Sequence, residues 1–75
     1  MRIEIRTVGN IIQHISCDRG DPVWKLKQNI ENETGHCSFQ QHLIFKGRKL
    51  SDIEIINEDL ITEGDHLVLV IMKVL

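Results

Sequence analysis

The first seven residues, MRIEIRT, alternate between apolar and polar side chains. A period of two predicts a strand with one buried face and one exposed face. The pair Gly9-Asn10 follows, and both residue types tolerate a positive φ angle, so the chain can turn sharply there. A second apolar segment at residues 11–17 then predicts that the two strands form a hairpin.

After residue 21 the apolar residues recur at intervals of three and four, as they do on one face of a helix. Asp21 can cap the first free amides, and Pro22 suits the first helical position. Gly35 is a natural C-cap, because glycine adopts the left-handed conformation that ends many helices. We therefore expect a helix over residues 22–34.

Three further strands are predicted after the helix. Residues 41–45 form the third strand, and the tight turn Lys46-Gly47-Arg48 follows, with Gly47 able to take a positive φ angle. A short fourth strand starts at Lys49, a one-turn helix is expected near residues 56–59, and the last strand covers residues 66–72. The order β-β-α-β-β-β predicts an α+β domain with one main helix packed on one face of a mixed sheet.

The last predicted strand, HLVLVIM at residues 66–72, is apolar on both faces. A single helix covers one face of a sheet, so the other face should be open. Ile44 on the third strand also points away from the side of Leu43. If these strands are neighbours, Ile44, Val68 and Val70 form an exposed apolar cluster, which is typical of a binding surface. Exposed valines on a strand can also reflect β propensity alone.

Basic residues are predicted to lie around this cluster, namely Arg6, His42 and Arg48. A positively charged rim favours a partner that carries acidic groups.

Composition excludes several classes of function. The chain has 75 residues with 41 % hydrophobic and 27 % charged residues, which predicts one folded domain. A net charge of −2 is too close to neutral to favour nucleic acid or an anionic membrane as a partner. The longest apolar run is far shorter than the ~20 residues of a membrane helix. Cys17 and Cys37 are interpreted as reduced thiols, which predicts a cytoplasmic or nuclear protein.

The cysteine and histidine residues do not have the spacing of a metal site or a catalytic site. No C-x-x-C or H-x-x-x-H pattern is present, and no glycine-rich phosphate loop occurs. Cys17 falls on the same strand face as Ile15, as a small core residue would. We therefore expect neither a metal, nor a cofactor, nor an enzymatic activity.

The segment QQHLIFKGRKLSD, together with MRIEIRT and VWKLKQNIENETG, resembles ubiquitin and its relatives. The resemblance extends without a gap from Met1 to Met72, and the run Q-Q-x-L-I-F-x-G-x-x-L-x-D is quite specific to this family. It implies the β-grasp fold, in agreement with the predicted order of elements. It also implies that the open sheet face binds helices and loops of receptor domains. The predicted partner-binding residues are Val8, His42, Ile44, Gly47, Arg48, Val68, Val70 and Met72.

Several departures from ubiquitin concern its conjugation chemistry. Ubiquitin ends in Gly-Gly, whereas this sequence ends in MKVL with no glycine after Gly64. The principal chain-linking position holds Arg48 and another holds Glu63, while Lys27 is retained at a position that is usually packed. The resemblance therefore implies a domain that is recognised but not conjugated. A covalent modifier whose conjugating C-terminus is not represented is the alternative.

We expect residues 1–75 to be a ubiquitin-like domain of the kind that is built into larger proteins. The expected partners are ubiquitin-binding domains, proteasomal receptors or another domain of the parent protein, and the domain itself is expected to be a monomer. A third hypothesis is the binding of a small GTPase by edge-strand pairing, for which Arg2 and Arg6 are the only support.

Overall fold

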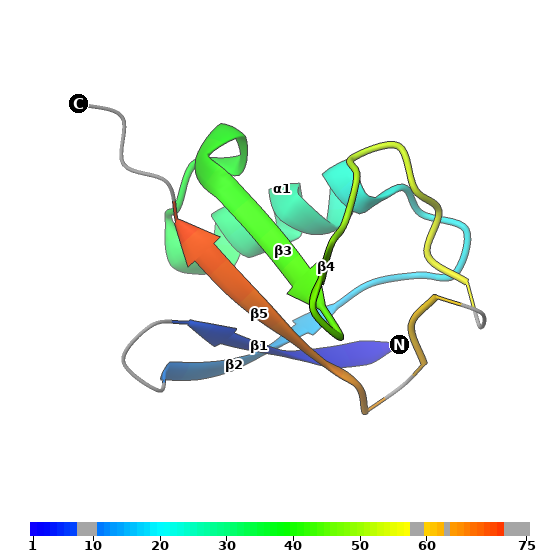
Figure 1. The fold of residues 1–75 in the computed structure, drawn as a ribbon. Coiled ribbons are helices and arrows are strands. Elements are labelled where there is room, and N and C mark those ends of the chain that lie inside the picture. The colour runs from blue at the N-terminus through cyan, green and yellow to red at the C-terminus, as the bar shows by residue number, and fades with distance from the viewer. Residues whose placement is uncertain (8–10, 58–59, 63, 72–75) are drawn as a thin grey trace.

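Five strands form one sheet, and a single long helix lies across one of its faces in the computed structural model (Figure 1). The structure describes residues 1–7, 11–57, 60–62 and 64–71. The elements within these residues are β1 (Arg2–Thr7), β2 (Ile11–Ser16), α1 (Val23–Thr34), the 3-10 helix η1 (Ser38–Gln40), β3 (Gln41–Phe45), β4 (Arg48–Lys49) and β5 (His66–Ile71). The predicted α+β class and the predicted order of the main elements are confirmed.

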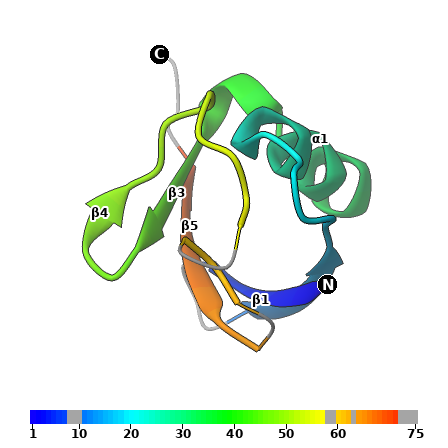
Figure 2. The ribbon, with the colours of Figure 1, turned by 90° about the vertical axis from the view of Figure 1, so that its right-hand side faces the viewer.

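The sheet has the strand order β2-β1-β5-β3-β4. Strands β1 and β5 pair in parallel, and the other neighbouring strands pair antiparallel, so the sheet is mixed as predicted. The view in Figure 2 shows α1 on one side of the curved sheet. The pairing of β3 with β5 confirms that the third and last strands are neighbours.

The core lies between α1 and the inner face of the sheet. Alternation along β1 and β5 buries one side chain in two, and Ile3, Ile5, Leu67 and Leu69 are completely buried. Cys17 is also buried, as predicted for a small core residue. The helix contributes the apolar face formed by Val23, Leu26 and Ile30.

The prediction that Asp21 caps the helix is wrong. Pro22 occupies the N-cap position in an extended conformation, the helix begins one residue later than predicted, and no side chain caps it. The carboxylate of Asp21 instead accepts a hydrogen bond from the backbone amide of Asp18 at 3.3 Å. Gly35 is the C-cap, as predicted, with a φ angle of 80°.

A distant loop satisfies the first amides of α1. The backbone amide of Val23 donates to the carbonyl of Glu54 at 2.8 Å, and that of Trp24 donates to the carbonyl of Asp52 at 3.1 Å. These tertiary bonds supply the partners that free N–H groups at a helix start require, so no local cap is needed. A rule that considers only neighbouring residues cannot find partners this far along the chain.

The one-turn helix predicted near residues 56–59 falls partly on Glu58 and Asp59, which lie outside the described residues. Ile56 is fully buried and is not helical. The backbone amides of Leu60 and Ile61 both donate to the carbonyl of Asn57, at 3.1 and 2.9 Å, so the chain turns at this point. No helix among the described residues is long and apolar enough to cross a membrane.

Gly47 is required by the turn that joins β3 to β4. Lys46 and Gly47 have φ angles of 51° and 78°, and positive values at both central residues define the hairpin turn that matches the twist of the strands. We expect Gly47→Ala to lower the free energy of unfolding by about 1 kcal/mol, because a Cβ disfavours this conformation. The added Cβ meets no atom within 4 Å, so no clash contributes.

Urea denaturation measures the Gly47→Ala effect. Lys46→Gly is the control, because Lys46 at a φ angle of 51° lies within the left-handed region that L residues adopt, whereas Gly47 at 78° lies beyond it. This control should relieve little strain and should lower the free energy of unfolding only slightly, through the unfolded-state entropy of glycine. A Gly47→Ala variant as stable as the parent would contradict this account of the turn.

Asp65 stabilises the turn that precedes β5. Its carboxylate accepts hydrogen bonds from the backbone amide of Thr62 at 2.8 Å and from the Thr62 hydroxyl at 3.0 Å. The backbone bond is the main reason that the pKa of Asp65 is lowered. The folded state therefore binds this proton less readily than the unfolded state, so the bonds stabilise the fold above the ordinary carboxyl pKa.

This stabilisation should be lost as the pH falls through the lowered pKa of Asp65. We expect Asp65→Asn to reduce stability at pH ~7 and to weaken the dependence of stability on pH below ~4, near the ordinary value for an aspartate. Urea denaturation at both pH values measures the difference. Glu33→Gln, on the exposed side of α1, is the control for removing one carboxylate, and equal effects of the two substitutions would contradict this role of Asp65.

Candidate functional site

The face of the sheet opposite α1 carries the predicted apolar cluster. Strand alternation directs Val68 and Val70 to this face, because the intervening residues of β5 are buried in the core. Antiparallel pairing places Ile44 directly opposite Val68, and His42 directly opposite Val70. The structure thus brings together four of the predicted binding residues, and the described residues place no other element over them (Figures 1 and 2).

The side chains of the cluster are less exposed to solvent than their position on an open face predicts. Val68 retains 41 % of its accessible surface, whereas Ile44 and Val70 are only half-exposed. Ile44 lies between two cross-strand neighbours, Val68 on β5 and Lys49 on β4, and their side chains cover part of its surface. Phe45, on the following position, is partly buried and packs against the core.

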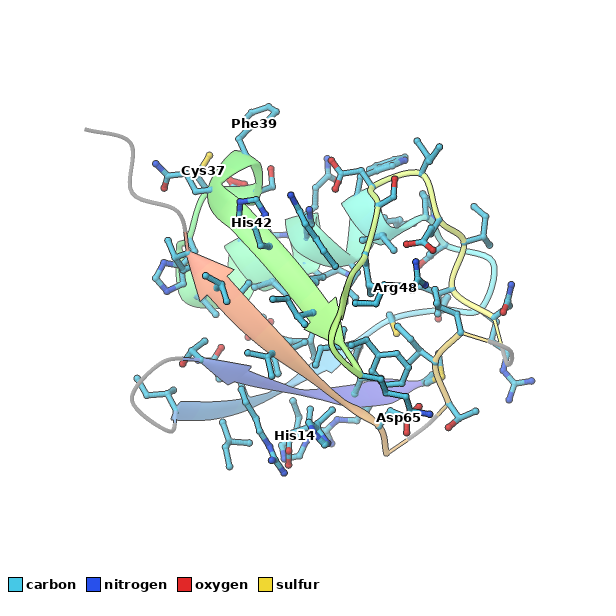
Figure 3. The ribbon with its side chains drawn as sticks, viewed as in Figure 1. His14, Cys37, Phe39, His42, Arg48 and Asp65 are labelled. Atoms are coloured by element: carbon cyan, nitrogen blue, oxygen red, sulfur yellow. The ribbon has the colours of Figure 1, made fainter. Side chains whose placement is uncertain are left out.

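Arg48 does not share the face of Ile44. The turn of two residues pairs Phe45 with Arg48, and cross-strand partners project to the same side of a sheet. The Arg48 guanidinium donates to a carboxylate oxygen of Glu54 at 2.7 Å, and Figure 3 shows it directed toward the loop of residues 51–57. The backbone amide of Ser51 and the Arg48 guanidinium together hold the pKa of Glu54 below its ordinary value.

Lys49, rather than Arg48, is the basic residue of β4 that lies next to Ile44. It is the cross-strand partner of Ile44, it is exposed, and within the described part of the chain it has no ion-pair partner. A sequence signal for this residue did exist. If Lys46 and Gly47 form a two-residue hairpin turn, Phe45 pairs with Arg48, and Ile44 therefore pairs with Lys49.

The predicted basic rim is partly neutralised. Arg6 lies on the open face beside Val68, and its Nε donates to a carboxylate oxygen of Glu4 at 2.6 Å. Arg48 is likewise paired with a carboxylate. Among the described residues, Lys49 rather than either arginine carries a positive charge without an ion-pair partner beside Ile44.

His42 borders a groove of about 490 Å³ beside β3. Its Nε2 atom is buried without a hydrogen-bond partner among the described residues. Phe39, which also lines the groove, is 93 % exposed, and Figure 3 shows its ring pointing away from the body of the domain. Phe39 is not among the residues that the sequence predicts for the site.

Three predicted site residues remain, namely Gly47, Val8 and Met72. Gly47 lies in the turn beside the cluster, as predicted. Val8 and Met72 lie outside the described residues, so their predicted roles stay predictions.

Lys27 is packed, as the resemblance implied for this position. Its side chain is 7 % exposed, and its ammonium group bonds to the carboxylate of Asp52 at 2.5 Å.

Burial raises the pKa of the Cys17 thiol, which makes it a poorer nucleophile. The described residues contain no group of three or more side chains that could hold a metal ion.

Leu43 and Ile44 are adjacent on β3 and point to opposite faces of the sheet, so a substitution at each position tests this assignment. Leu43 is completely buried, so Leu43→Ala should lower the free energy of unfolding by about 2–5 kcal/mol. Ile44→Ala should cost about 1 kcal/mol or less, because the residue already contacts solvent. Chemical denaturation of both variants measures the contrast, and equal losses would contradict the assignment of Ile44 to an open face.

Comparison with known protein families agrees with this geometry. The chain matches the model of the family described as "Ubiquitin family" over residues 3–73. No curated protein matches the chain. The match covers nearly the whole sequence, and the mixed sheet packed on one helix is the β-grasp arrangement that the resemblance implied. The chain belongs to the ubiquitin family.

Proposed function

We propose that this domain is a non-conjugated protein-interaction module that binds its partners through the apolar cluster of Ile44, Val68 and Val70. Ubiquitin-like domains generally mediate protein–protein interactions. The observation that supports the proposal most directly is the cross-strand pair of Ile44 and Val68 on the face away from α1. Aliphatic side chains that neighbouring strands place together on an open face favour contact with another protein.

The size of the cluster favours weak binding. Three partly exposed aliphatic side chains bury little area in a complex, and complexes with small interfaces are usually transient. We therefore expect dissociation constants that are about micromolar or weaker. The partners proposed are ubiquitin-binding domains, proteasomal receptors or another domain of the parent protein.

Charge around the cluster supports a partner that carries an acidic group. Lys49 is exposed next to Ile44 and is not neutralised by a described residue. Its effect is on the rate and the orientation of association more than on affinity, because exposed charges are screened by water and salt.

Two side chains support a role without chain extension. Arg48, at the position of the principal chain-linking lysine, cannot form an isopeptide bond, and its guanidinium is paired with Glu54. Lys27 retains the amine but is buried in its ion pair with Asp52. Incubation of the full-length gene product with ubiquitin-activating enzyme and ATP should yield no thioester adduct, and a stable adduct would instead favour the covalent modifier.

Binding can be mapped by NMR titration with recombinant ubiquitin-binding domains and proteasomal ubiquitin receptors. The largest shift changes should cluster at His42, Ile44, Val68 and Val70. Ile44→Ala should weaken binding by about tenfold or more, as for a central apolar contact. The control is Ile53→Ala, because Ile53 is 81 % exposed but lies on a loop outside the sheet. Shift changes scattered away from the cluster, or equal effects of both variants, would contradict the proposal.

A further inference from the structure

A second exposed apolar patch lies on the α1 side of the sheet, where the loop of residues 51–57 passes the start of the helix (Figure 2). Trp24 is 48 % exposed, Ile53 is 81 % exposed and Ile55 is 46 % exposed. A single exposed side chain of this kind is common, but three of them on one part of the surface indicate a site of contact with another molecule. We call Trp24, Asp52, Ile53 and Ile55 the loop patch.

Backbone contacts bring the members of the loop patch together. Pro22 and Ile55 form an isolated antiparallel bridge, and the amide of Trp24 donates to the carbonyl of Asp52 at 3.1 Å. The two segments run in opposite directions, so Trp24, two residues after Pro22, lies beside Ile53, two residues before Ile55. The hydrogen bonds that satisfy the start of α1 therefore also build this surface.

Asp52 gives the loop patch an exposed acidic group. Its Oδ1 atom lies 2.5 Å from the Nζ atom of Lys27, which is one turn after Trp24 on α1. The side chain of Lys27 is 7 % exposed, whereas that of Asp52 is 60 % exposed. A partner that contacts this surface therefore meets the carboxylate, while the ammonium group that balances it is buried.

The charges around the loop patch favour a cationic partner. The segment of residues 51–62 contains aspartate and glutamate but neither lysine nor arginine. Lys25, in the first turn of α1, lies 3.8 Å from the carboxylate of Asp21. The loop patch thus has the opposite preference to the Ile44 cluster, where Lys49 favours an acidic partner.

We propose that the loop patch binds a short peptide segment of a partner protein in which an arginine or lysine adjoins an aliphatic residue. The cationic side chain lies over the Trp24 indole ring and beside the Asp52 carboxylate, because aromatic faces and carboxylates both attract cations. The aliphatic side chain packs on Ile53 and Ile55, which removes apolar surface of both molecules from water.

The size of the loop patch favours a peptide over a second copy of this chain. A stable dimer buries about 800 Å² on each subunit. A large apolar side chain contributes at most about 250 Å², and the three in the loop patch are already partly covered. A short segment needs less area, and we expect it to bind with a dissociation constant of about 0.1–1 mM.

This inference does not rest on the proposed function. The loop patch lies on the side of the sheet that carries α1, and the cluster of Ile44, Val68 and Val70 lies on the opposite face. A partner on one surface therefore leaves the other uncovered, and the domain can connect an acidic partner to a protein with a basic segment.

The probe is an acetylated and amidated hexapeptide in which leucine alternates with arginine. Two matched peptides carry glutamine or glutamate in place of each arginine, so the role of the cation is tested without a change in the domain. Trp24 is the only tryptophan in the chain, and its fluorescence emission therefore reports on the loop patch. NMR titration up to millimolar peptide maps the contact.

We expect the arginine peptide to change the emission of Trp24 and to shift the NMR signals of Trp24, Ile53 and Ile55. The glutamine peptide should bind about threefold more weakly or worse, and the glutamate peptide about tenfold more weakly or worse. These differences should shrink at high salt, because salt screens the attraction between exposed charges.

Ile53→Ala should weaken binding of the arginine peptide by about threefold or more, because it removes apolar surface that the peptide covers. Ile11→Ala is the matched control, because Ile11 is 56 % exposed on β2 and lies outside both surfaces. It should change the affinity by less than about twofold. Urea denaturation of both variants checks that the fold is retained.

Three results would overturn the inference. Equal affinities of the three peptides would exclude the role of the cation, and an unchanged Trp24 emission at millimolar arginine peptide would exclude the site. Shifts at Ile44, Val68 and Val70 without shifts at the loop patch would place the peptide on the other surface. None of these results affects the proposed function, which is tested by Ile44→Ala and ubiquitin-binding domains.

Discussion

The packing of α1 against the sheet determines which side of every strand faces water. Val23, Leu26 and Ile30 of the helix are completely buried against the inner face, to which Ile3 and Leu67 contribute. Because side chains alternate along a strand, this contact also directs every second residue of the central strands to the opposite face. A shift of one residue in any strand would move its buried side chains to the open face and its exposed side chains into the core. The packing of the core therefore also determines which residues lie on the open face.

The loop of residues 51–57 links the stability of the fold to the electrostatics of the candidate surface. Its carbonyls accept the first amides of α1, and Asp52 pairs with the buried ammonium of Lys27. The same loop holds Glu54, whose carboxylate accepts a hydrogen bond from the Arg48 guanidinium on the side of β4 away from Ile44. Among the described residues, Lys49 remains an exposed cation beside Ile44, because strand pairing places it there.

The apolar cluster combines partial burial with partial exposure. Ile44 and Val70 contact their cross-strand neighbours, and this contact reduces the apolar area that the free domain presents to water. Val68 remains more exposed and is the cross-strand partner of both Arg6 and Ile44. A surface of this kind can be stable in water and can still gain free energy when a second apolar surface covers it.

Sequence periodicity determined most of the architecture. The alternation in MRIEIRT, the helical spacing after Pro22 and the left-handed positions of Gly35 and Gly47 are local properties, and the structure contains each of them. The sequence also predicted that Ile44 and Val68 share a face if their strands are neighbours, and the structure supplies that pairing. These features follow from backbone geometry and hydrophobic burial over a few neighbouring residues, which a single sequence contains.

Only the tertiary structure decided the remaining features. The helix start is satisfied by Glu54 and Asp52 rather than by Asp21, Arg48 is bound to Glu54, and Lys49 lies beside Ile44. Each of these depends on which distant backbone or side-chain group lies within hydrogen-bond distance, or on the register across several strands. Hydrogen bonds and strand registers join residues that are far apart in the chain, so the sequence alone establishes the separate elements and their faces, and the folded sheet determines which side chains meet.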